Sequence, residues 1–345
     1  MFYREYIKIK SLVVHSVGNK LHQEDVRLSK RPLSVDAEVK QFLTAYFVSA
    51  FKSPEYFTFL PDSESTRNRV FACARRIFDD PETLLDQSVV LARHLYDRSE
   101  HPKIKGGEFY TVYFQECIID GETVDAVGLF KSENKDTFLK IYPAGESFEI
   151  ESETGINIHK LDKGCLIFNT EQDKGYVVAV VDNTGKGTDA QYWMDDFLHV
   201  GPRHDDYYHT QQALSLCGRF VREELPQQFD MSKADQAALL NKSVQFFKDR
   251  DTFNVNEFAA EVMEQPDLAE RFGKYKSDYQ RERDIEIADD FAISDSAVKK
   301  QARVLRSVIK LDKNFHIYVH GNRNLIEQGV DENGKFYKIY YREES

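Results

Sequence analysis

The side chains best suited to chemistry are lysines and arginines near the C-terminal end of the chain. Seven basic residues lie between Ser296 and Asn324, where Asp312 is the one acidic residue. Such a local excess of positive charge is what contact with DNA phosphates requires, so the segment predicts a DNA-binding surface. The predicted contact residues are Lys299, Lys300, Arg303, Arg306, Lys310, Lys313 and Arg323.

The spacing of these residues predicts a helix with two distinct sides. From Lys299 to Lys313 five of them follow at intervals of four, three, four and three, which places them on one side of a helix. An apolar stripe precedes them by one residue, and together they predict a helix from Ser294 to about Leu311. The stripe consists of Val298, Ala302, Leu305 and Ile309.

Two other interpretations of the basic stripe stay open. A charged helix face is often simply solvated, and lysines near a helix C-terminus also suit the helix dipole. The stripe can equally neutralise an acidic surface of this chain or of a second subunit, such as the segment ESFEIESETG at 146–155.

A second group of polar side chains has the residue types of a metal site. It contains His204, Asp205, Asp206 and His209. Histidines five residues apart do not share a helical face, and no other His/Asp/Glu cluster completes a site. We expect a helix start with acidic residues in its first turn. A metal-dependent nuclease or phosphodiesterase that uses these residues is a third functional hypothesis, ranked after the two given at the end of this section.

The segment from Asn183 to Thr188 resembles a phosphate-binding loop only in its glycines. Gly187 separates Lys186 from Thr188, whereas a P-loop needs the Lys directly before Ser or Thr. We expect an ordinary loop that leaves a strand. No catalytic Ser or Cys motif is present. The sequence therefore predicts no enzyme, no cofactor, no catalytic residue and no metal site.

The four cysteines are irregularly spaced and form no C-x-x-C pair. Cys73, Cys117, Cys165 and Cys217 are therefore expected to be buried, free thiols.

Charge and composition indicate a globular protein that is acidic as a whole. The chain carries 46 Lys and Arg against 58 Asp and Glu, a net charge of −12 at pH 7, so any DNA contact must be local. Its apolar fraction of 41% is that of a globular protein. No apolar run is long enough to span a membrane, and the N-terminus lacks the features of a secretory signal. We expect a cytoplasmic protein without membrane contact.

The elements that position these residues indicate an α+β fold of two domains. Residues 1–200 open with a strand and helices, including an apolar helical stripe from Val35 to Phe47 and a helix start at Asp80-Pro81. Five β-rich runs follow, among them 136–143, with a hairpin signal at Asp120-Gly121. They predict a mostly antiparallel central sheet with helices packed on one face.

Residues 201–345 form the second predicted domain, which is mainly helical. Its helical stripes are followed by the basic helix and by short antiparallel strands. The turn at 331–334 makes the last two strands a hairpin.

Most of the chain, from about residue 5 to 342, resembles the NdpA-like family of bacterial nucleoid-associated proteins. The likeness is carried by segments 101–142, 156–183, 190–200 and 311–341, and it is closest to Bacteroides-type members. The resemblance implies association with the bacterial nucleoid, DNA binding and a cytoplasmic location. The family has no catalytic motif to carry over.

These observations lead to two main functional hypotheses. The first is a nucleoid-associated protein without catalytic activity that contacts double-stranded DNA through the basic helix. The second is an adaptor that another chromosome-processing protein recruits, with an exposed aromatic patch near Tyr192 and Trp193. A homodimer is compatible with both.

Overall fold

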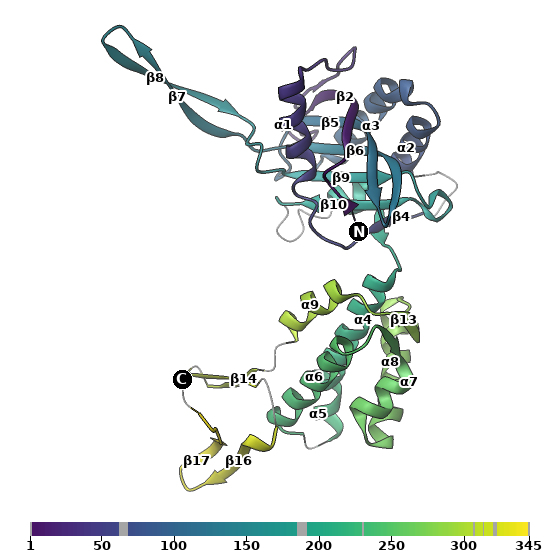
Figure 1. Cartoon of the computed structure of the whole chain (residues 1–345), viewed down its shortest axis with the longest axis vertical. Helices are drawn as coiled ribbons and strands as arrows, with labels where there is room; N and C mark the ends of the chain where they lie inside the picture. The colour runs from purple at the N-terminus through teal and green to yellow at the C-terminus, as the bar shows by residue number, and fades with distance from the viewer. Residues whose placement is uncertain are drawn as a thin grey trace. The chain divides into compact units, whose positions relative to one another are not determined.

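The chain folds into two compact units, residues 1–203 (unit 1) and 204–345 (unit 2) (Figure 1). The computed structural model describes residues 2–61, 68–184, 192–229, 231–305, 308–312, 314–319 and 323–343. Helices and antiparallel strands occur in both units, which confirms the α+β class.

An antiparallel sheet forms the centre of unit 1. Its strands run in the order β11-β4-β10-β9-β6-β5-β2-β3, and β1 pairs with the C-terminal end of β5. The strands are β1 (Phe2–Tyr3), β2 (Lys8–Val17), β3 (Val26–Arg27), β4 (Phe57–Phe59), β5 (Gly107–Ile119), β6 (Glu122–Ser132), β9 (Lys163–Phe168), β10 (Val177–Asp182) and β11 (Val200–Pro202).

The hairpin between β5 and β6 turns where the sequence predicted. Asp120 and Gly121 have φ angles of 49° and 87°, and both lie in the left-handed region that a two-residue hairpin of this kind needs. Glycine adopts this conformation without strain, and aspartate is among the few other residues that tolerate it.

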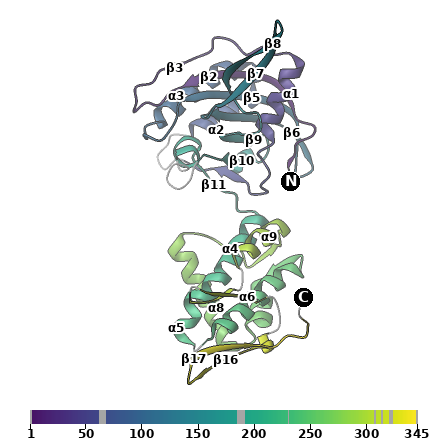
Figure 2. The same ribbon diagram turned by 90° about the vertical axis from the view of Figure 1, so that its left-hand side faces the viewer.

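Helices cover both faces of this sheet, so the expectation of a single covered face was wrong. Helices α2 (Arg69–Asp79) and α3 (Leu84–Arg98) pack on one face, whereas α1 (Ala37–Val48) packs on the other. Figure 2 shows α3 and α1 on opposite sides of the strands. The reason lies in β6 and β9, whose successive side chains are apolar on both faces and need a cover on each.

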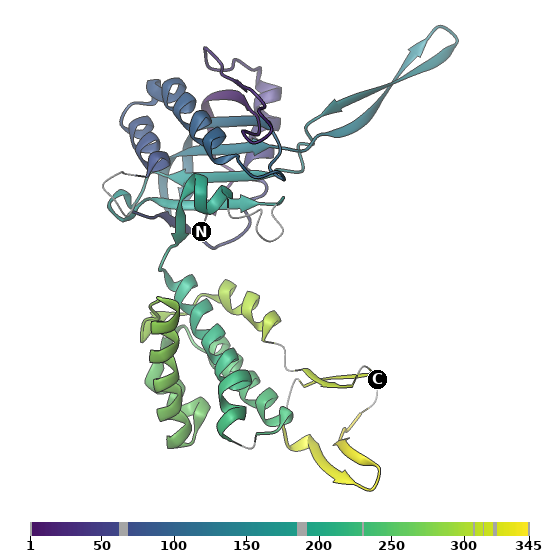
Figure 3. The same cartoon turned by 180° about the vertical axis from the view of Figure 1, so that it is seen from behind.

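Strands β7 (Asp136–Ala144) and β8 (Ser147–Gly155) do not join the sheet, and this corrects the prediction for residues 136–143. Among the described strands they pair only with each other, and they form a hairpin, the β7–β8 arm, that extends away from the rest of unit 1 (Figures 1 and 3). Every second side chain of β8 is acidic, from Glu149 to Glu153, so this strand cannot enter a sheet that is buried on both faces.

A buried histidine joins β2 to α3. His15 is 2% exposed, and its Nδ1 accepts a hydrogen bond from the Ser29 N–H at 3.1 Å. Nε2 therefore carries the proton and donates to Ser88 Oγ at 2.8 Å, and the Ser88 hydroxyl donates to the Leu85 carbonyl at 2.7 Å. Burial lowers the pKa of His15, and this network is satisfied only by the neutral ring.

Unit 2 is mainly helical and has its own core. Phenylalanines dominate it, with Phe253 stacked between Phe247 and Phe291 at centroid distances of 5.0 and 4.8 Å. Its helical elements are α4 (Asp206–Arg219), η5 (Phe220–Glu224), α5 (Leu225–Gln228), α6 (Lys233–Lys248), α7 (Val255–Phe258), η6 (Ala259–Met263), α8 (Pro266–Arg283), α9 (Asp295–Val304) and η7 (Arg323–Leu325).

Three pairs of short antiparallel strands occur among the described residues of unit 2, and the last two pairs are hairpins. They are β12 (Thr252–Asn254) with β13 (Asp290–Ala292), β14 (Val308–Leu311) with β15 (Phe315–Tyr318), and β16 (Ile326–Asp331) with β17 (Gly334–Ile339). The last pair confirms the hairpin that the sequence predicted at 331–334. In the part of the chain that the structure describes, no helix is long and apolar enough to cross a membrane.

All four cysteines are buried and free, as the sequence predicted. Burial raises the pKa of the Cys73 thiol to about 11 and that of Cys117 to about 12, and it raises the pKa values of Cys165 and Cys217 as well. Because the thiolate is the reactive form, these side chains act as small apolar core residues.

The His15 network makes the stability of the protein depend on pH. Below pH 6.5 the unfolded chain protonates His15, whereas the folded chain resists protonation, so the free energy of unfolding should fall as the pH drops. His94, whose pKa burial also lowers, acts in the same direction. Urea unfolding between about pH 7.5 and pH 5.5 measures this slope, a range that lies above the ordinary carboxyl pKa values.

His15→Gln should reduce the slope, and the same substitution at exposed His101 should leave it unchanged. Nitrogen-15 NMR of the His15 ring should show the proton on Nε2. A His15 pKa above 6.5, or stability that rises on acidification, would contradict this account.

Candidate functional site

Helix α9 carries the first part of the predicted DNA-binding surface. Lys299 and Arg303 are one helical turn apart and both are exposed, as is Lys300. On the other side Val298 and Leu305, which are 3% and 4% exposed, pack into the core of unit 2. Leu305 occupies the space beside Gly218 of α4, where any larger residue would collide with it. The apolar face of α9 therefore packs into the core, and its basic face is exposed to solvent.

The basic residues do not all share one helix, and this corrects the prediction of a helix reaching Leu311. Helix α9 ends at Val304, and Lys310 lies on strand β14. Arg306 and Lys313 fall outside the described residues. Arg323 is the first residue of η7, and its side chain is not among those described. The structure thus brings Lys299, Lys300 and Arg303 together on one element and places Lys310 on another.

The hairpin β14–β15 explains why the helix stops. Ile309 is 1% exposed and packs against Ala234 and Ala237 of α6, in a cluster separate from the one that holds Leu305. A continuous helix would have placed Ile309 beside Leu305. Pairing with the strand that starts at Phe315, together with β-branched residues at 308 and 309, favours the extended form instead.

On this hairpin Lys310 lies opposite His316, and the exposed Tyr318 occupies the same face. Tyr318 is 54% exposed. A lysine beside exposed rings is suited to phosphate contact and to stacking. Phe315, the other aromatic residue of the segment, belongs to the opposite face.

A basic residue that the sequence analysis missed lies at the end of α9. The Arg222 guanidinium donates a hydrogen bond to the Val304 carbonyl at 3.3 Å, although 82 residues separate them. Lys300 extends over the Tyr207 ring of α4 at 5.5 Å. We call Lys299, Lys300, Arg303 and Arg222 the α9 basic surface. Its fourth member has no sequence signal, because it comes from the segment after α4.

Charge within unit 2 is unevenly distributed along the chain. Residues 204–295 contain eleven lysines and arginines against twenty acidic residues, whereas residues 296–345 contain ten against six. A polyanion would therefore be repelled by most of this unit and attracted to the segment that begins with α9.

The cluster at His204 is the start of a helix. The Asp205 carboxylate accepts a hydrogen bond from the Tyr208 N–H at 3.1 Å and caps α4, and Asp206 is in its first turn. The His204 ring stacks on Tyr208 at 4.3 Å. This confirms the expected helix start. Within the described ranges no group of three or more His, Cys, Asp or Glu side chains is placed to hold a metal ion. Of the glycine-rich loop, residues 185–188 lie outside the described residues.

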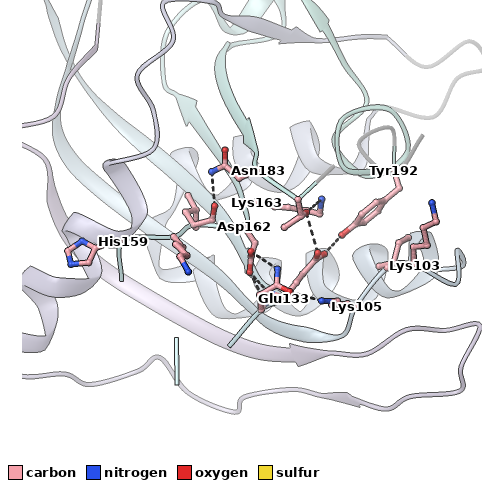
Figure 4. Close-up of a pocket in the computed structure, with 13 residues that line it drawn as sticks. Lys103, Lys105, Glu133, His159, Asp162, Lys163, Asn183 and Tyr192 are labelled. Carbon is pink, nitrogen blue, oxygen red and sulfur yellow. Dashed lines mark hydrogen bonds between the residues drawn. The ribbon is translucent and has the colours of Figure 1, made fainter. Parts of the chain in front are cut away.

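Unit 1 has a polar pocket of about 560 Å³ whose wall contains buried charges (Figure 4). Lys163 donates to both Asp182 carboxylate oxygens at 2.8 Å, and these side chains are 2% and 6% exposed. Deeper in unit 1, Lys131 forms an ion pair with Glu133 at 3.0 Å. Both lysine side chains lie over the ring of Tyr192.

Each of these two buried lysines is thus paired with a carboxylate. The Tyr192 hydroxyl donates to Glu133 at 2.7 Å, and burial raises the pKa of Tyr192 well above its ordinary value. Burial lowers the pKa of Lys131, and the Glu133 carboxylate opposes that effect. The network ties β6, β9 and the turn of η4 (Tyr192–Leu198) together. Lys103, Lys105 and Lys160 also line the pocket, where Lys160 pairs with Asp136 at 2.9 Å and Lys105 donates to Asn134 at 2.6 Å.

The same region corrects the expectation of an exposed aromatic patch. Tyr192 is 6% exposed and Trp193 is fully buried in the core of unit 1, so neither presents a surface to a partner. The sequence analysis did not identify Lys131 and Lys163 as buried charges. Each adjoins an apolar run, which is also the pattern of an exposed lysine at the end of a strand.

The buried ion pair between Lys163 and Asp182 should stabilise the folded protein. Lys163→Met leaves the Asp182 carboxylate buried without its cation, which should lower the free energy of unfolding by about 3–5 kcal/mol. Urea denaturation followed by the fluorescence of Trp193, the one tryptophan, measures it. Lys160→Met removes the same charge from the exposed side of this pocket and should change stability little. Adding Asp182→Asn to Lys163→Met should restore much of the stability, and equal effects of the two single variants would contradict the argument.

The comparison with known families agrees with this architecture. A family model described as nucleoid-associated protein YejK matches residues 13–335, which span most of both units and include the α9 basic surface. No individually curated protein matches the chain. Since the match extends over most of the chain, this protein belongs to the YejK family of nucleoid-associated proteins.

Proposed function

We propose that this nucleoid-associated protein contacts double-stranded DNA directly, through the α9 basic surface and the basic residues that follow it. The observation that carries the proposal is the pair Lys299 and Arg303, exposed one turn apart on a helix whose opposite side is anchored in the core. A fixed helix holds its cations at set positions, so binding costs little conformational entropy beyond that of the lysine and arginine side chains themselves.

The residue types of this surface suit phosphates. Arg303 and Arg222 present planar guanidinium groups that can bind two phosphate oxygens at once, and the lysines add point charges. Lys310 extends the set on β14, and we include Arg306, Lys313 and Arg323 from the same basic segment. Such contacts read the backbone and carry no sequence preference of their own.

The acidic remainder of the chain limits how DNA can be bound. With a net charge of −12 the protein is repelled by DNA everywhere except near such a patch. We therefore infer a local contact at the nucleoid, in the cytoplasm, and not a coating of the duplex. The role we propose is one of binding without catalysis.

An adaptor role is the second candidate function, and the net charge of −12 favours it. A strongly acidic protein can reach the nucleoid through a basic or DNA-bound partner protein without touching DNA. Absence of direct binding in the experiment below would make this the preferred function.

The test is fluorescence anisotropy with a duplex of ~30 bp over a range of salt concentrations. Lys299→Glu/Arg303→Glu/Lys310→Glu should weaken binding on the order of 100-fold at low salt and reduce the slope of log affinity against log salt by about three. The reason is that a phosphate without a protein cation beside it keeps its condensed counterions when the complex forms.

A matched control separates this surface from general repulsion. Lys248→Glu/Lys274→Glu/Arg281→Glu changes the net charge by the same amount in the acidic part of unit 2. It should keep the native salt slope and nearly the native affinity. Equally weakened binding in the two triple variants, or no binding by the folded native protein at low salt, would refute direct contact at α9.

A further inference from the structure

The β7–β8 arm has one apolar face without a cover. Residues paired across the two strands share a face, so Leu139, Ile141, Phe148 and Ile150 lie together on one side. Their exposures are 67%, 61%, 69% and 63%, respectively. An isolated two-stranded hairpin is marginally stable in water, and an apolar face of this length needs a partner surface.

The opposite face of the arm is mostly polar and internally paired, with Phe138 as its one large apolar side chain. Lys140 forms an ion pair with Glu153 at 3.2 Å, and the Tyr142 hydroxyl donates to Glu151 at 2.6 Å. The whole arm, residues 136–155, contains one lysine against five acidic residues. This charge excludes DNA as the occupant of the arm, because phosphates would be repelled.

An apolar groove of about 480 Å³ lies at the base of the arm. One wall consists of Leu33 and Val35, which precede α1, and of Val39 and Leu43 on α1, and Val39 is 40% exposed. The wall is fixed to β2, because the Leu33 N–H donates to the Leu12 carbonyl at 2.8 Å. We call this the α1 groove.

The arm and the groove form one continuous surface. Thr154, on the apolar face of the arm, also lines the α1 groove. The arm extends away from the rest of unit 1 (Figures 1 and 3), and its four exposed apolar side chains are not among those that line the groove, so the arm does not fill the groove of its own chain. A second copy offers the same two surfaces side by side. A twofold axis then lets each arm enter the other groove, and the assembly closes at two copies.

Charge and area both favour this occupant. Arg27, Lys30 and Arg31, all exposed, lie in the segment that leads to the groove wall, opposite in charge to an acidic arm. Covering the four apolar side chains would bury roughly 400 Å² of each arm and a similar area of each groove, or about 1,600 Å² in all, the size of a standard protein interface.

We propose that two copies of this chain form a twofold dimer by exchanging their β7–β8 arms, each arm seating its apolar face in the α1 groove of the other copy. The dimer is independent of the DNA contact on unit 2. It doubles the number of basic surfaces per assembly, which strengthens binding to a single duplex when both can reach it.

Sedimentation velocity of the full chain tests the dimer. The native protein should sediment at twice the chain mass of 40.1 kDa at roughly 10 µM, since interfaces of this size dissociate at micromolar concentrations or lower. Ile141→Lys/Ile150→Lys on the arm, and Val39→Glu in the groove, should each give monomers. These positions are exposed, so circular dichroism should show the native fold.

Two controls define what the result means. Lys140→Ser/Glu151→Ser, on the polar face of the same arm, should leave the dimer intact. In a mixture of differently tagged chains, Ile150→Cys in one and Val39→Cys in the other should form a disulfide between copies, with little background because the native cysteines are buried.

Three results would overturn the proposal. One is a monomeric native protein at that concentration, and another is a dimer that survives the arm variants. The third is cross-linking of Ile150→Cys to itself but not to Val39→Cys, since the two arms would then pack on each other and not in the grooves.

Discussion

The burial of β6 and β9 on both faces is the constraint on which unit 1 depends. Successive side chains of β9, Leu166 and Ile167 among them, point to opposite faces and are fully buried. Helices must therefore cover both sides of the sheet, and α1 covers the face opposite α2 and α3. The same burial surrounds Lys131 and Lys163, and each of them forms an ion pair with a carboxylate, Glu133 and Asp182, respectively.

The two units differ in where their charged side chains lie and in what those side chains contact. The charges inside unit 1 are used to pair with one another, so its pocket is held together by its own ions. In unit 2 the core is apolar and rich in phenylalanine, and the positive charge of the C-terminal segment lies on exposed positions such as Lys299 and Arg303. A buried ion pair supports a fold, whereas an exposed cation on a fixed helix is available to a partner.

Several features could be predicted from the sequence because they depend on near neighbours. The turns at Asp120-Gly121 and 331–334, the helix start at Asp205 and the burial of the cysteines follow from local conformational preference and side-chain chemistry. The α+β class follows from the periodicity of the chain, whereas the nucleoid-associated family was indicated by the resemblance of segments such as 101–142 and 156–183 to known members. The start of α9 and its buried apolar side were also predicted from periodicity.

Other features were decided by contacts between distant segments. A lysine at the end of an apolar run has the same local pattern whether a carboxylate meets it or water does, so the Lys163–Asp182 pair had no sequence signal. Alternating residues in β7 predicted a strand but not that it leaves the sheet. Helix α9 ends at Val304 because the residues that follow it form β14, which pairs with β15. Arg222, which belongs to another helix, donates a hydrogen bond to the Val304 carbonyl. Periodicity determines which sides of an element are apolar or charged, and only tertiary packing determines which surface each side meets.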